Sequence, residues 1–418
     1  MNSNRARRAL AEAVAASAAR ASKRPSGGRG AVSSPAGRFE TLARESADDG
    51  WYREDGEPPA LRTEVTEERA RSILAFNDSP DLPFDRSLNP YRGCEHGCTY
   101  CFARPTHAWL GLSPGLDFET RLRAKVNAAE RLRAELAAPA YRCAPVNIGS
   151  ATDAYQPIER ERRLTRAVLE VLSECSHPLT IVTKSSLVER DIDLLAPMAR
   201  RGLAAVYVSV STLDPALARA WEPRAAAPWR RLRTIRRLAD AGIPVGVAVA
   251  PVVPFLNEPE LERVLEQAAQ AGASSAFYTI LRLPWELREV FVDWLQSVYP
   301  DRAARIMNRL GDMRAGDGRA GGRGLGGRSA GGAGGARPLN DPRFFHRMTG
   351  QGGWAELVRL RFELAARKLG LDRERRSLRT DLFEPPARPQ RAPGAMVPAS
   401  SRVALEKAAA AALQQSLF

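Results

Sequence analysis

The chain has little cysteine and histidine, with five Cys and four His among 418 residues. Such a small, odd number of cysteines gives no even disulfide framework, and no signal-peptide pattern precedes them, so we expect reduced thiols and a cytoplasmic protein. No run of about 18 apolar residues is present, which argues against a membrane-spanning helix. Nothing in the sequence resembles a P-loop or a serine-type triad, and no GxGxxG dinucleotide turn follows a predicted strand.

The net charge of +14 is concentrated in two segments. Residues 1–39 carry +7 and residues 312–337 carry +3, which leaves +4 for the rest of the chain. Two interpretations stay open: a solvated, disordered run of charge, or non-specific attraction to the phosphates of a nucleic acid.

Composition divides the chain into a main domain and several appendages. The first segment has almost no large apolar side chain and cannot offset the entropy of ordering, so we expect a disordered basic tail. The Gly/Arg-rich stretch before residue 339 is typical of a flexible linker. Beyond it, Leu357, Leu360, Leu364 and Leu369 recur at helical spacing. The expected segments are a tail (1–38), an N-terminal extension (39–83), the main domain (84–311), the linker (312–338), a helical C-terminal extension (339–390) and a C-terminal tail (391–418).

The main domain alternates short β-branched apolar runs with helical patterns. A first strand is expected just before Cys94, and further strands over 145–151, 179–183, 205–211, 244–253 and 275–281. Helices are expected over about 117–137, 159–174, 187–200, 228–240 and 258–271. Strict strand–helix alternation predicts a parallel α/β sheet, and six units predict a partial (β/α)6 barrel of the TIM type. In that architecture chemistry lies at the C-terminal ends of the strands.

Three of the five cysteines fall within eight residues of the stretch NPYRGCEHGCTYCFAR, residues 89–104. A structural zinc site normally takes a fourth protein ligand. The spacing Cys94-x3-Cys98-x2-Cys101 also suits a [4Fe–4S] cluster in which each cysteine binds one iron and the fourth iron is left for a substrate. On spacing alone both metals remain possible.

The motif CEHGCTYC, with aromatic residues on both sides of the third cysteine, resembles the cluster loop of the radical S-adenosylmethionine (radical SAM) superfamily. The wider stretch resembles the branch that includes spore photoproduct lyase. Similarity continues through TDAYQPIE (152–159), VTKSS (182–186), VSVSTLD (208–214) and WEPR (221–224). It covers roughly residues 84–300.

The resemblance implies that Cys94, Cys98 and Cys101 hold a [4Fe–4S] cluster whose open iron binds S-adenosylmethionine (SAM). One electron, from a donor such as flavodoxin or ferredoxin, then cleaves SAM to methionine and a 5′-deoxyadenosyl radical that abstracts a hydrogen atom. By the same resemblance, Tyr100 and Phe102 pack against the cluster or the adenine of SAM, and Thr152 and Asp153 lie at its methionine end. Lys184 pairs with the carboxylate of SAM. Ser209 and Ser211 bind its ribose or amino-acid portion. For each of these residues, core packing or a turn contact is the alternative.

Other residues in these motifs have less defined roles. Tyr155 and Tyr278 lie at or near strand ends and are candidate catalytic hydrogen donors or substrate contacts, with a packed core tyrosine as the alternative for each. His96, between two ligands, is expected to be an exposed loop residue, and the alternative is a hydrogen bond to a cluster sulfur. Glu159, Glu222 and Arg224 are expected to fix loops at the barrel mouth or to form structural salt bridges.

The functional hypotheses differ mainly in the substrate. The lesion-repairing member of the branch uses a cysteine beside its second-strand motif as hydrogen donor, and the aligned residue here is Ser150. A hydroxyl O–H is much harder to break homolytically than a thiol S–H, so photoproduct lyase activity is not expected. We expect an enzyme that acts on a nucleic acid. The alternatives are an enzyme that acts on a protein side chain or a small metabolite, and a cluster-bearing sensor without catalysis.

Overall fold

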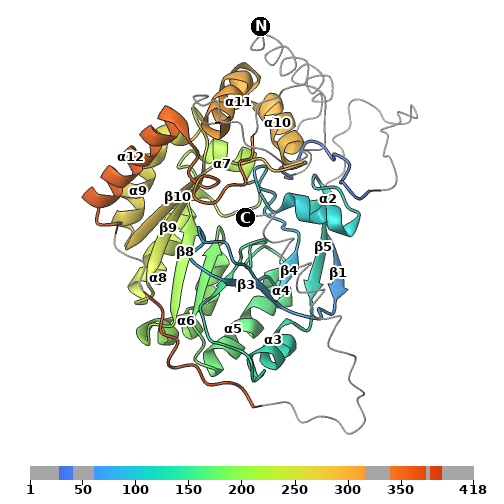
Figure 1. Ribbon diagram of the computed structural model, residues 1–418, viewed down its shortest axis with the longest axis vertical. Coiled ribbons are helices and arrows are strands. Elements are labelled where there is room, and N and C mark those ends of the chain that lie inside the picture. The colour runs from blue at the N-terminus through green and yellow to red at the C-terminus, as the bar shows by residue number, and fades with distance from the viewer. Residues whose placement is uncertain (1–27, 41–60, 316–338, 373–376, 388–418) are drawn as a thin grey trace, which may run out of the picture.

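The structure, a computed structural model, describes residues 28–40, 61–315, 339–372 and 377–387 (Figure 1). These ranges contain a sheet of seven strands and a smaller sheet of three. None of their helices has the length and apolar character needed to cross a membrane. Residues 1–27 of the expected tail, residues 316–338 of the expected linker, and the C-terminal tail lie outside the described residues.

The large sheet holds the six parallel strands predicted from the sequence. Their order is β3-β6-β7-β8-β9-β10, with β2 antiparallel on the outer side of β3. The bounds are β2 (Leu74–Phe76), β3 (Arg86–Leu88), β6 (Val146–Ile148), β7 (Leu179–Thr183), β8 (Ala204–Ser209), β9 (Val245–Val252) and β10 (Ser275–Ile280). Because the parallel strands follow one another in chain order, with helices between them, the fold is a partial (β/α)6 barrel.

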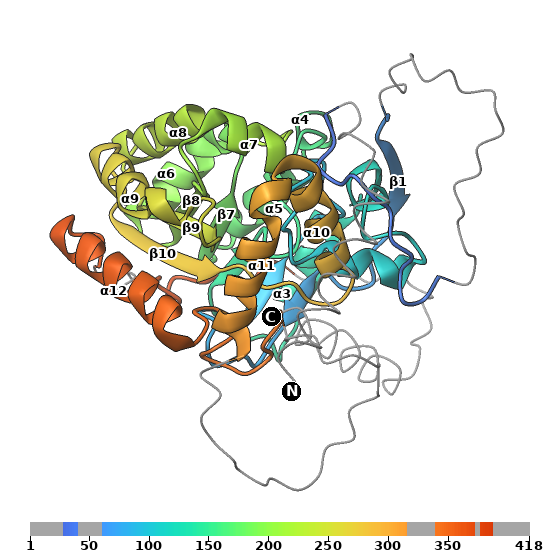
Figure 2. The ribbon, with the colours of Figure 1, turned by 90° about the horizontal axis from the view of Figure 1, so that it is seen from above.

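Helices that connect successive strands cover the outer face of this sheet. Figure 2 shows α6, α8 and α9 outside the strands β7 to β10. The connecting helices are α3 (Ala128–Leu136), α5 (Leu164–Glu174), α6 (Ile192–Arg200), α8 (Pro228–Asp240) and α9 (Leu261–Gln270). Their buried apolar residues and the outward-facing strand residues, such as Ile181 and Val206, form one continuous core.

Side chains on the other face of the strands point into the barrel and alternate with the core residues. Along β7 and just beyond it, Thr180, Val182 and Lys184 line the interior, and along β8 the interior residues are Ala205, Tyr207 and Ser209. The period of two follows from the pleat of a strand. It brings Lys184 and Ser209 to the same C-terminal edge of the sheet.

Several elements differ from the sequence-based expectation. The stretch 117–137 contains a short helix α2 (Asp117–Thr120), then strand β5 (Arg121–Lys125), then α3. Strand β5 pairs with β1 (Glu64–Glu68) and β4 (Tyr91–Arg92) in the small sheet. The expected helix 159–174 is divided by Arg163, at φ 52°, into α4 (Glu159–Arg162) and α5. Helices α7 (Pro215–Trp221), α10 (Leu287–Val298) and α11 (Pro300–Ala315) were not expected.

The C-terminal helix α12 (Gly352–Lys368) packs against the main domain. It contacts α9, α11 and β10, and Figure 2 shows it along the outer side of β10. Its buried residues are Ala355, Val358, Phe362 and Ala366. The helical spacing of the leucines is confirmed by α12, but Leu357, Leu360 and Leu364 are 43%, 43% and 63% exposed and do not form its buried face.

The segment 339–372 also covers the free edge of β10. The amide of Ala276 donates to the carbonyl of Leu371 (3.0 Å), and the amide of Ile280 donates to that of Met348 (2.8 Å). These bonds satisfy donors that an edge strand would otherwise present to other chains. The C-terminal extension is therefore part of the main domain.

Residues 28–40 are described and partly buried, although the sequence placed 28–38 in a disordered tail. Arg29 and Ala31 are each 1% exposed. A Cβ on Gly30 would lie 1.8 Å from the carbonyl oxygen of Gly97. The segment therefore lies directly on the cysteine loop, where only glycine fits.

Candidate active site

A cavity of about 1050 Å³ occupies the barrel interior and opens toward the cysteine loop. Strands β6 to β10 contribute Asn147, Val182, Ser209, Ala248 and Phe277, among other residues. All three clustered cysteines line the same cavity. The fold thus brings the thiols to the C-terminal end of the barrel, where the alternating pattern predicted the chemistry.

Glycine turns shape the cysteine loop. Gly93 and Gly97 have φ angles of 77° and 68°, which strain any residue with a side chain. The amide of Cys94 donates to the carbonyl of Phe118 (2.9 Å), and the amide of Cys101 donates to that of Cys98 (3.3 Å). Burial raises the pKa of all three thiols, that of Cys98 to about 12. Binding a metal there must therefore displace protons.

The arrangement of the sulfurs bears on the choice of metal. Cys98 and Cys101 both act electrostatically on Cys94, so the three thiols are neighbours. A cubane cluster suits such a loop, since each thiolate binds a different iron.

The outer side of the loop rests on a buried ion pair that sequence reasoning missed. Arg104 and Glu119 are both fully buried, with Nη2 2.5 Å from Oε1. Arg104 also donates to the carbonyls of Cys98 (2.8 Å) and Gly97 (3.0 Å). The carboxylate of Glu119 accepts from the amides of Gly30 (2.9 Å) and Ala31 (2.8 Å). Arg104 lies three residues after the last cysteine, but nothing in the sequence marks Glu119 as its partner.

A second buried network holds Tyr100. Its hydroxyl donates to Glu222, which also accepts from Arg231 and from Ser211 (2.5 Å). The ring of Tyr100 lies under Lys184, with Nζ 5.7 Å from the ring centroid. Tyr100 is therefore oriented by a carboxylate, and Ser211 is part of the same network and does not line the cavity.

Asp153 joins three parts of the site. Its carboxylate accepts from the hydroxyl of Thr183 (2.8 Å) and the amide of Lys184 (2.7 Å), and it lies 3.3 Å from Nδ1 of His96. Burial acts to raise the pKa of Asp153, but His96 and the hydrogen bonds from the amides of Lys184 and Tyr155 outweigh burial and lower this pKa to about 2. His96 is 2% exposed, so the expectation of an exposed loop histidine was wrong. Asp153 and His96 fix the cysteine loop to the end of β7.

Six of the seven predicted cofactor residues line the cavity: Tyr100, Phe102, Thr152, Asp153, Lys184 and Ser209. Burial acts to lower the pKa of Lys184, but Cys98 and Glu222 outweigh it, and the pKa is raised. The buried hydroxyl of Thr152 has no hydrogen-bond partner among the described residues. Burying a hydroxyl without a hydrogen-bond partner costs free energy unless a bound molecule supplies that partner. The hydroxyl of Thr152 faces the cavity, where a bound molecule would supply it. These residues fit a polar cofactor bound beside the cysteines.

Of the two tyrosines predicted as hydrogen donors or substrate contacts, only Tyr278 is among the residues that line the cavity, and its ring packs outside the barrel. Tyr155 is fully buried in the core and does not line the cavity. The guanidinium carbon of Arg190 lies 5.9 Å from the centroid of its ring. Tyr278 lies in β10, and its ring packs on Phe362 of α12 with centroids 4.7 Å apart. The residue before it, Phe277, packs on Tyr207 inside the barrel. Alternation along the strand therefore directs Tyr278 outward.

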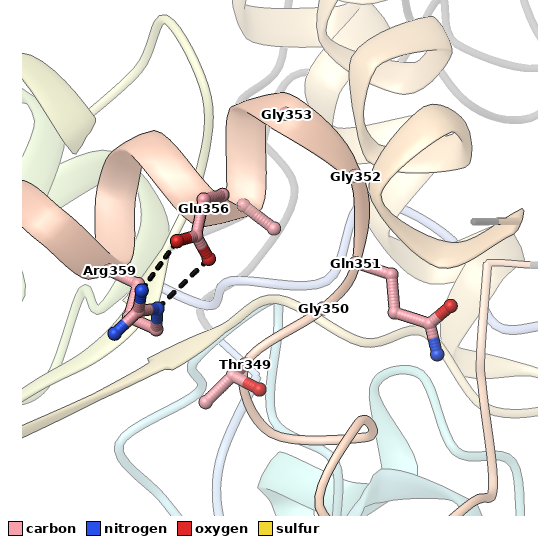
Figure 3. A pocket seen from close by; sticks show the side chains of 8 residues that line it. Thr349, Gly350, Gln351, Gly352, Gly353, Glu356 and Arg359 are labelled. Atoms are coloured by element: carbon pink, nitrogen blue, oxygen red, sulfur yellow. Dashed lines mark hydrogen bonds and ion pairs between the residues drawn. The ribbon is translucent and has the colours of Figure 1, made fainter. Parts of the chain in front are cut away.

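The remaining motif residues form ion pairs at the barrel mouth. Arg224 lies 3.2 Å from Glu95, and Arg190 lies 2.7 Å from Glu159. A second hollow of about 350 Å³ lies at the start of α12 (Figure 3). Glu356 and Arg359 in its wall are paired with each other, as the dashed lines show.

Comparison with known proteins agrees with this geometry. The family model of the radical SAM superfamily matches residues 88–268. An uncharacterised protein of Mycobacterium tuberculosis, Rv2578c, is 39% identical over 236 residues, which span 55% of this chain and 69% of that protein. The uncharacterised protein MJ0683 of Methanocaldococcus jannaschii is 26% identical over 222 residues, which span 53% and 79%. The chain belongs to the radical SAM superfamily.

Among solved structures, a mutant of spore photoproduct lyase matches with a TM-score of 0.48 and 18% identity, over 73% of this chain and 80% of that one. Spore photoproduct lyase complexed with dinucleoside spore photoproduct matches with a TM-score of 0.42 and 19% identity, over 56% and 66%. As a radical SAM enzyme the protein uses a [4Fe–4S] cluster and SAM, and it needs a reductant.

Proposed function

We propose that this enzyme cleaves SAM reductively and uses the resulting radical on a nucleic acid. In this proposal Cys94, Cys98 and Cys101 each bind one iron, and Thr152, Lys184 and Ser209 hold SAM. When bound, the cluster and SAM supply a 5′-deoxyadenosyl radical that abstracts a hydrogen atom from the substrate. The observation that carries the proposal is that three cysteines, a lysine and a buried hydroxyl without a partner among the described residues face one cavity.

The residues of the chain would bind and orient the reactants. Lys184 would pair with the carboxylate of SAM as a compact positive charge. The hydroxyls of Thr152 and Ser209 would donate to polar groups of SAM. Glu222 would act through Tyr100 and so position the loop, and Asp153, which lines the cavity, would hold His96 and face the methionine end of SAM. The barrel walls would exclude water from the radical.

A nucleic-acid substrate is the finer part of the proposal. It is supported by the motifs shared with the spore photoproduct lyase branch and by the positive net charge. A flavodoxin or a ferredoxin is the electron donor we propose. Cleavage of SAM in the presence of a true substrate should exceed the slow uncoupled reaction, so oligonucleotides can be compared with small metabolites by the rate of 5′-deoxyadenosine formation.

Anaerobic reconstitution tests the core of the proposal. The protein would be incubated with iron and sulfide, then with dithionite and SAM, and analysed for metal and for 5′-deoxyadenosine. We expect about four irons per chain and formation of 5′-deoxyadenosine. Cys98→Ala should lose both. The matched control is Cys143→Ser, because Cys143 is only partly buried, precedes β6 and does not line the cavity.

Two results would contradict the assignment. Continued SAM cleavage by Cys98→Ala would show that this thiol is not a ligand. A single zinc with no cleavage by the wild-type protein would mean that the three cysteines serve structure.

A further inference from the structure

Phe345 places a large aromatic ring on the wall of the cavity. The residue is 64% exposed, yet it lines the same cavity as the three cysteines. The ring of the neighbouring Phe344 is covered by the guanidinium group of Arg347, 4.8 Å from its centroid, whereas no aromatic or cationic side chain among the described residues stacks on Phe345. An open aromatic face on a cavity wall offers a surface on which a flat ring can stack.

The backbone of Phe345 is held in a conformation that bulky residues rarely adopt. Its φ angle of 65° lies in the left-handed region. The amide of Phe345 donates to Asp81 (3.1 Å), and the hydroxyl of Thr349 donates to its carbonyl (3.1 Å). Such a conformation persists only where the surrounding structure imposes it, and it is concentrated at binding and active sites. The ring is therefore fixed in its exposed position before any ligand binds.

The segment that carries Phe345 spans the open side of the partial barrel. Strands β10 and β2 are the two ends of the strand order. Ile280 of β10 donates to the carbonyl of Met348, and Asp81, in the loop between β2 and β3, pairs with Arg347 (2.5 Å). Phe345 thus lies between the two edges of the sheet. Because its ring is both exposed and part of the cavity wall, it marks an entrance from solvent.

The cavity has room for a substrate beside SAM. Its volume of about 1050 Å³ is at the upper end of the range for pockets that hold one small molecule, roughly 300–1000 Å³. Lys184 and Ser209, the residues proposed to hold SAM, line the cavity from the strand ends near the cysteines. Phe345 lines it from the C-terminal extension. The part of the cavity beside Phe345 is therefore left for the substrate.

We propose that Phe345 is a stacking platform for a nucleobase of the substrate. Bases of any sequence stack on aromatic side chains because every base has a π face. The hydroxyl of Thr349 lines the same wall and donates to the backbone, so its lone pairs can accept an N–H from the edge of the base. This inference rests on the proposed function and names the part of the nucleic acid that the cavity takes.

Binding of short oligonucleotides tests the platform without turnover. Fluorescein-labelled hexathymidylate, and a hexamer of the same charge that lacks all bases, would be titrated with reconstituted protein without SAM or reductant and followed by fluorescence anisotropy. We expect Phe345→Ala to weaken binding of hexathymidylate roughly five- to 150-fold, the range for loss of one stacked base. Phe345→Trp should retain the affinity. The matched control is Trp229→Ala, because Trp229 is 62% exposed but lies on α8 and does not line the cavity.

The hexamer without bases separates stacking from attraction of the phosphates. It should bind equally to the wild type and to Phe345→Ala. The dependence of hexathymidylate binding on salt should have the same slope in both proteins, since the ring neutralises no phosphate. If Phe345→Ala binds hexathymidylate like the wild type, or weakens the binding of both hexamers equally, the inference is overturned.

A folding defect in Phe345→Ala would not leave the question open. In that case the wild-type protein decides it, because a stacked base must make hexathymidylate bind more tightly than the hexamer without bases. Equal affinities would refute the platform.

Failure of the platform is distinguishable from failure of the proposed function. Oligonucleotide binding that does not depend on Phe345 removes the platform and leaves the nucleic-acid substrate in place. Absence of oligonucleotide binding by the wild-type protein removes both, whereas the cleavage of SAM is followed separately by formation of 5′-deoxyadenosine.

Discussion

Replacing Glu119 by Gln should destabilise the protein strongly, although the two side chains have nearly the same shape. The carboxylate accepts three hydrogen bonds, from Arg104 and from the amides of Gly30 and Ala31, and both members of the ion pair are fully buried. A glutamine has one acceptor oxygen, so its NH2 group would face a donor. The buried charge of Arg104 would also lose its counter-charge.

The magnitude follows from that burial. Removing one partner of a buried ion pair costs about 3–5 kcal/mol, because the other charge remains in a poorly polarisable environment. At roughly 2 °C per kcal/mol for a domain of this size, the melting temperature should fall by about 6–10 °C. Urea denaturation followed by circular dichroism measures the free energy of unfolding, and metal analysis after reconstitution reports on the loop that Arg104 supports.

A matched control is available on the surface. Glu130 pairs with Arg69 at 3.2 Å, but both side chains are about two-thirds exposed or more. Glu130→Gln should therefore change the free energy of unfolding by less than about 1 kcal/mol. If Glu119→Gln were within about 1 kcal/mol of the wild type, the buried pair would not support the loop as argued. Combining Glu119→Leu with Arg104→Met, which removes both charges together, should recover part of the loss if the unpaired charge is its cause.

Other predictions concern the loop, the cofactor site and acid stability. Gly30→Ala should unfold or loosen the loop because its Cβ would overlap the Gly97 carbonyl, whereas Gly353→Ala, in open space within α12, should be neutral or stabilising by up to about 1 kcal/mol in urea denaturation. Lys184→Ala should weaken SAM binding, measured by equilibrium dialysis, at unchanged iron content; loss of iron would make Lys184 structural. Burial lowers the pKa of His177 from 6.5 to about 4. As the pH falls, this imidazole is therefore protonated in the unfolded chain before it is protonated in the folded protein. The free energy of unfolding should fall by up to about 3 kcal/mol between pH 6.5 and pH 4. In His177→Gln, the free energy of unfolding from urea denaturation should fall less between pH 7 and pH 4.5 than in the wild type. An equal fall would refute this assignment.

The strand order of the barrel could be predicted because each strand–helix unit carries its own local pattern. Strand β7 and helix α8 have the bounds expected from the sequence. Elements without such a pattern were missed. Strand β5 has the sequence RLRAK, which is short and charged, and it forms only because β1 and β4 lie on either side of it.

Errors at the site came from judging side chains by position along a strand without counting its alternation. Ser275 and Phe277 share one face of β10, so Tyr278 must face the other, and this could have been inferred from the sequence. The buried face of α12, by contrast, could not be identified from the spacing of its apolar residues. Its leucines and its buried residues Ala355, Val358, Phe362 and Ala366 both recur at helical spacing, so the spacing alone does not show which face packs on β10 and α9. Contacts between distant segments, such as Glu119 with Arg104, carry no local signal.

The position of residues 28–31 has a practical consequence for shortened forms of the protein. Removal of the first 38 residues, which composition alone suggests, would delete two of the three donors to Glu119 and also Arg29, which donates to the carbonyls of Glu119 and Leu61. A protein shortened in this way should accumulate poorly for reasons unrelated to charge. Any test of the basic N-terminal residues as an anchor for nucleic acid should therefore begin the shortened chain at Gly28.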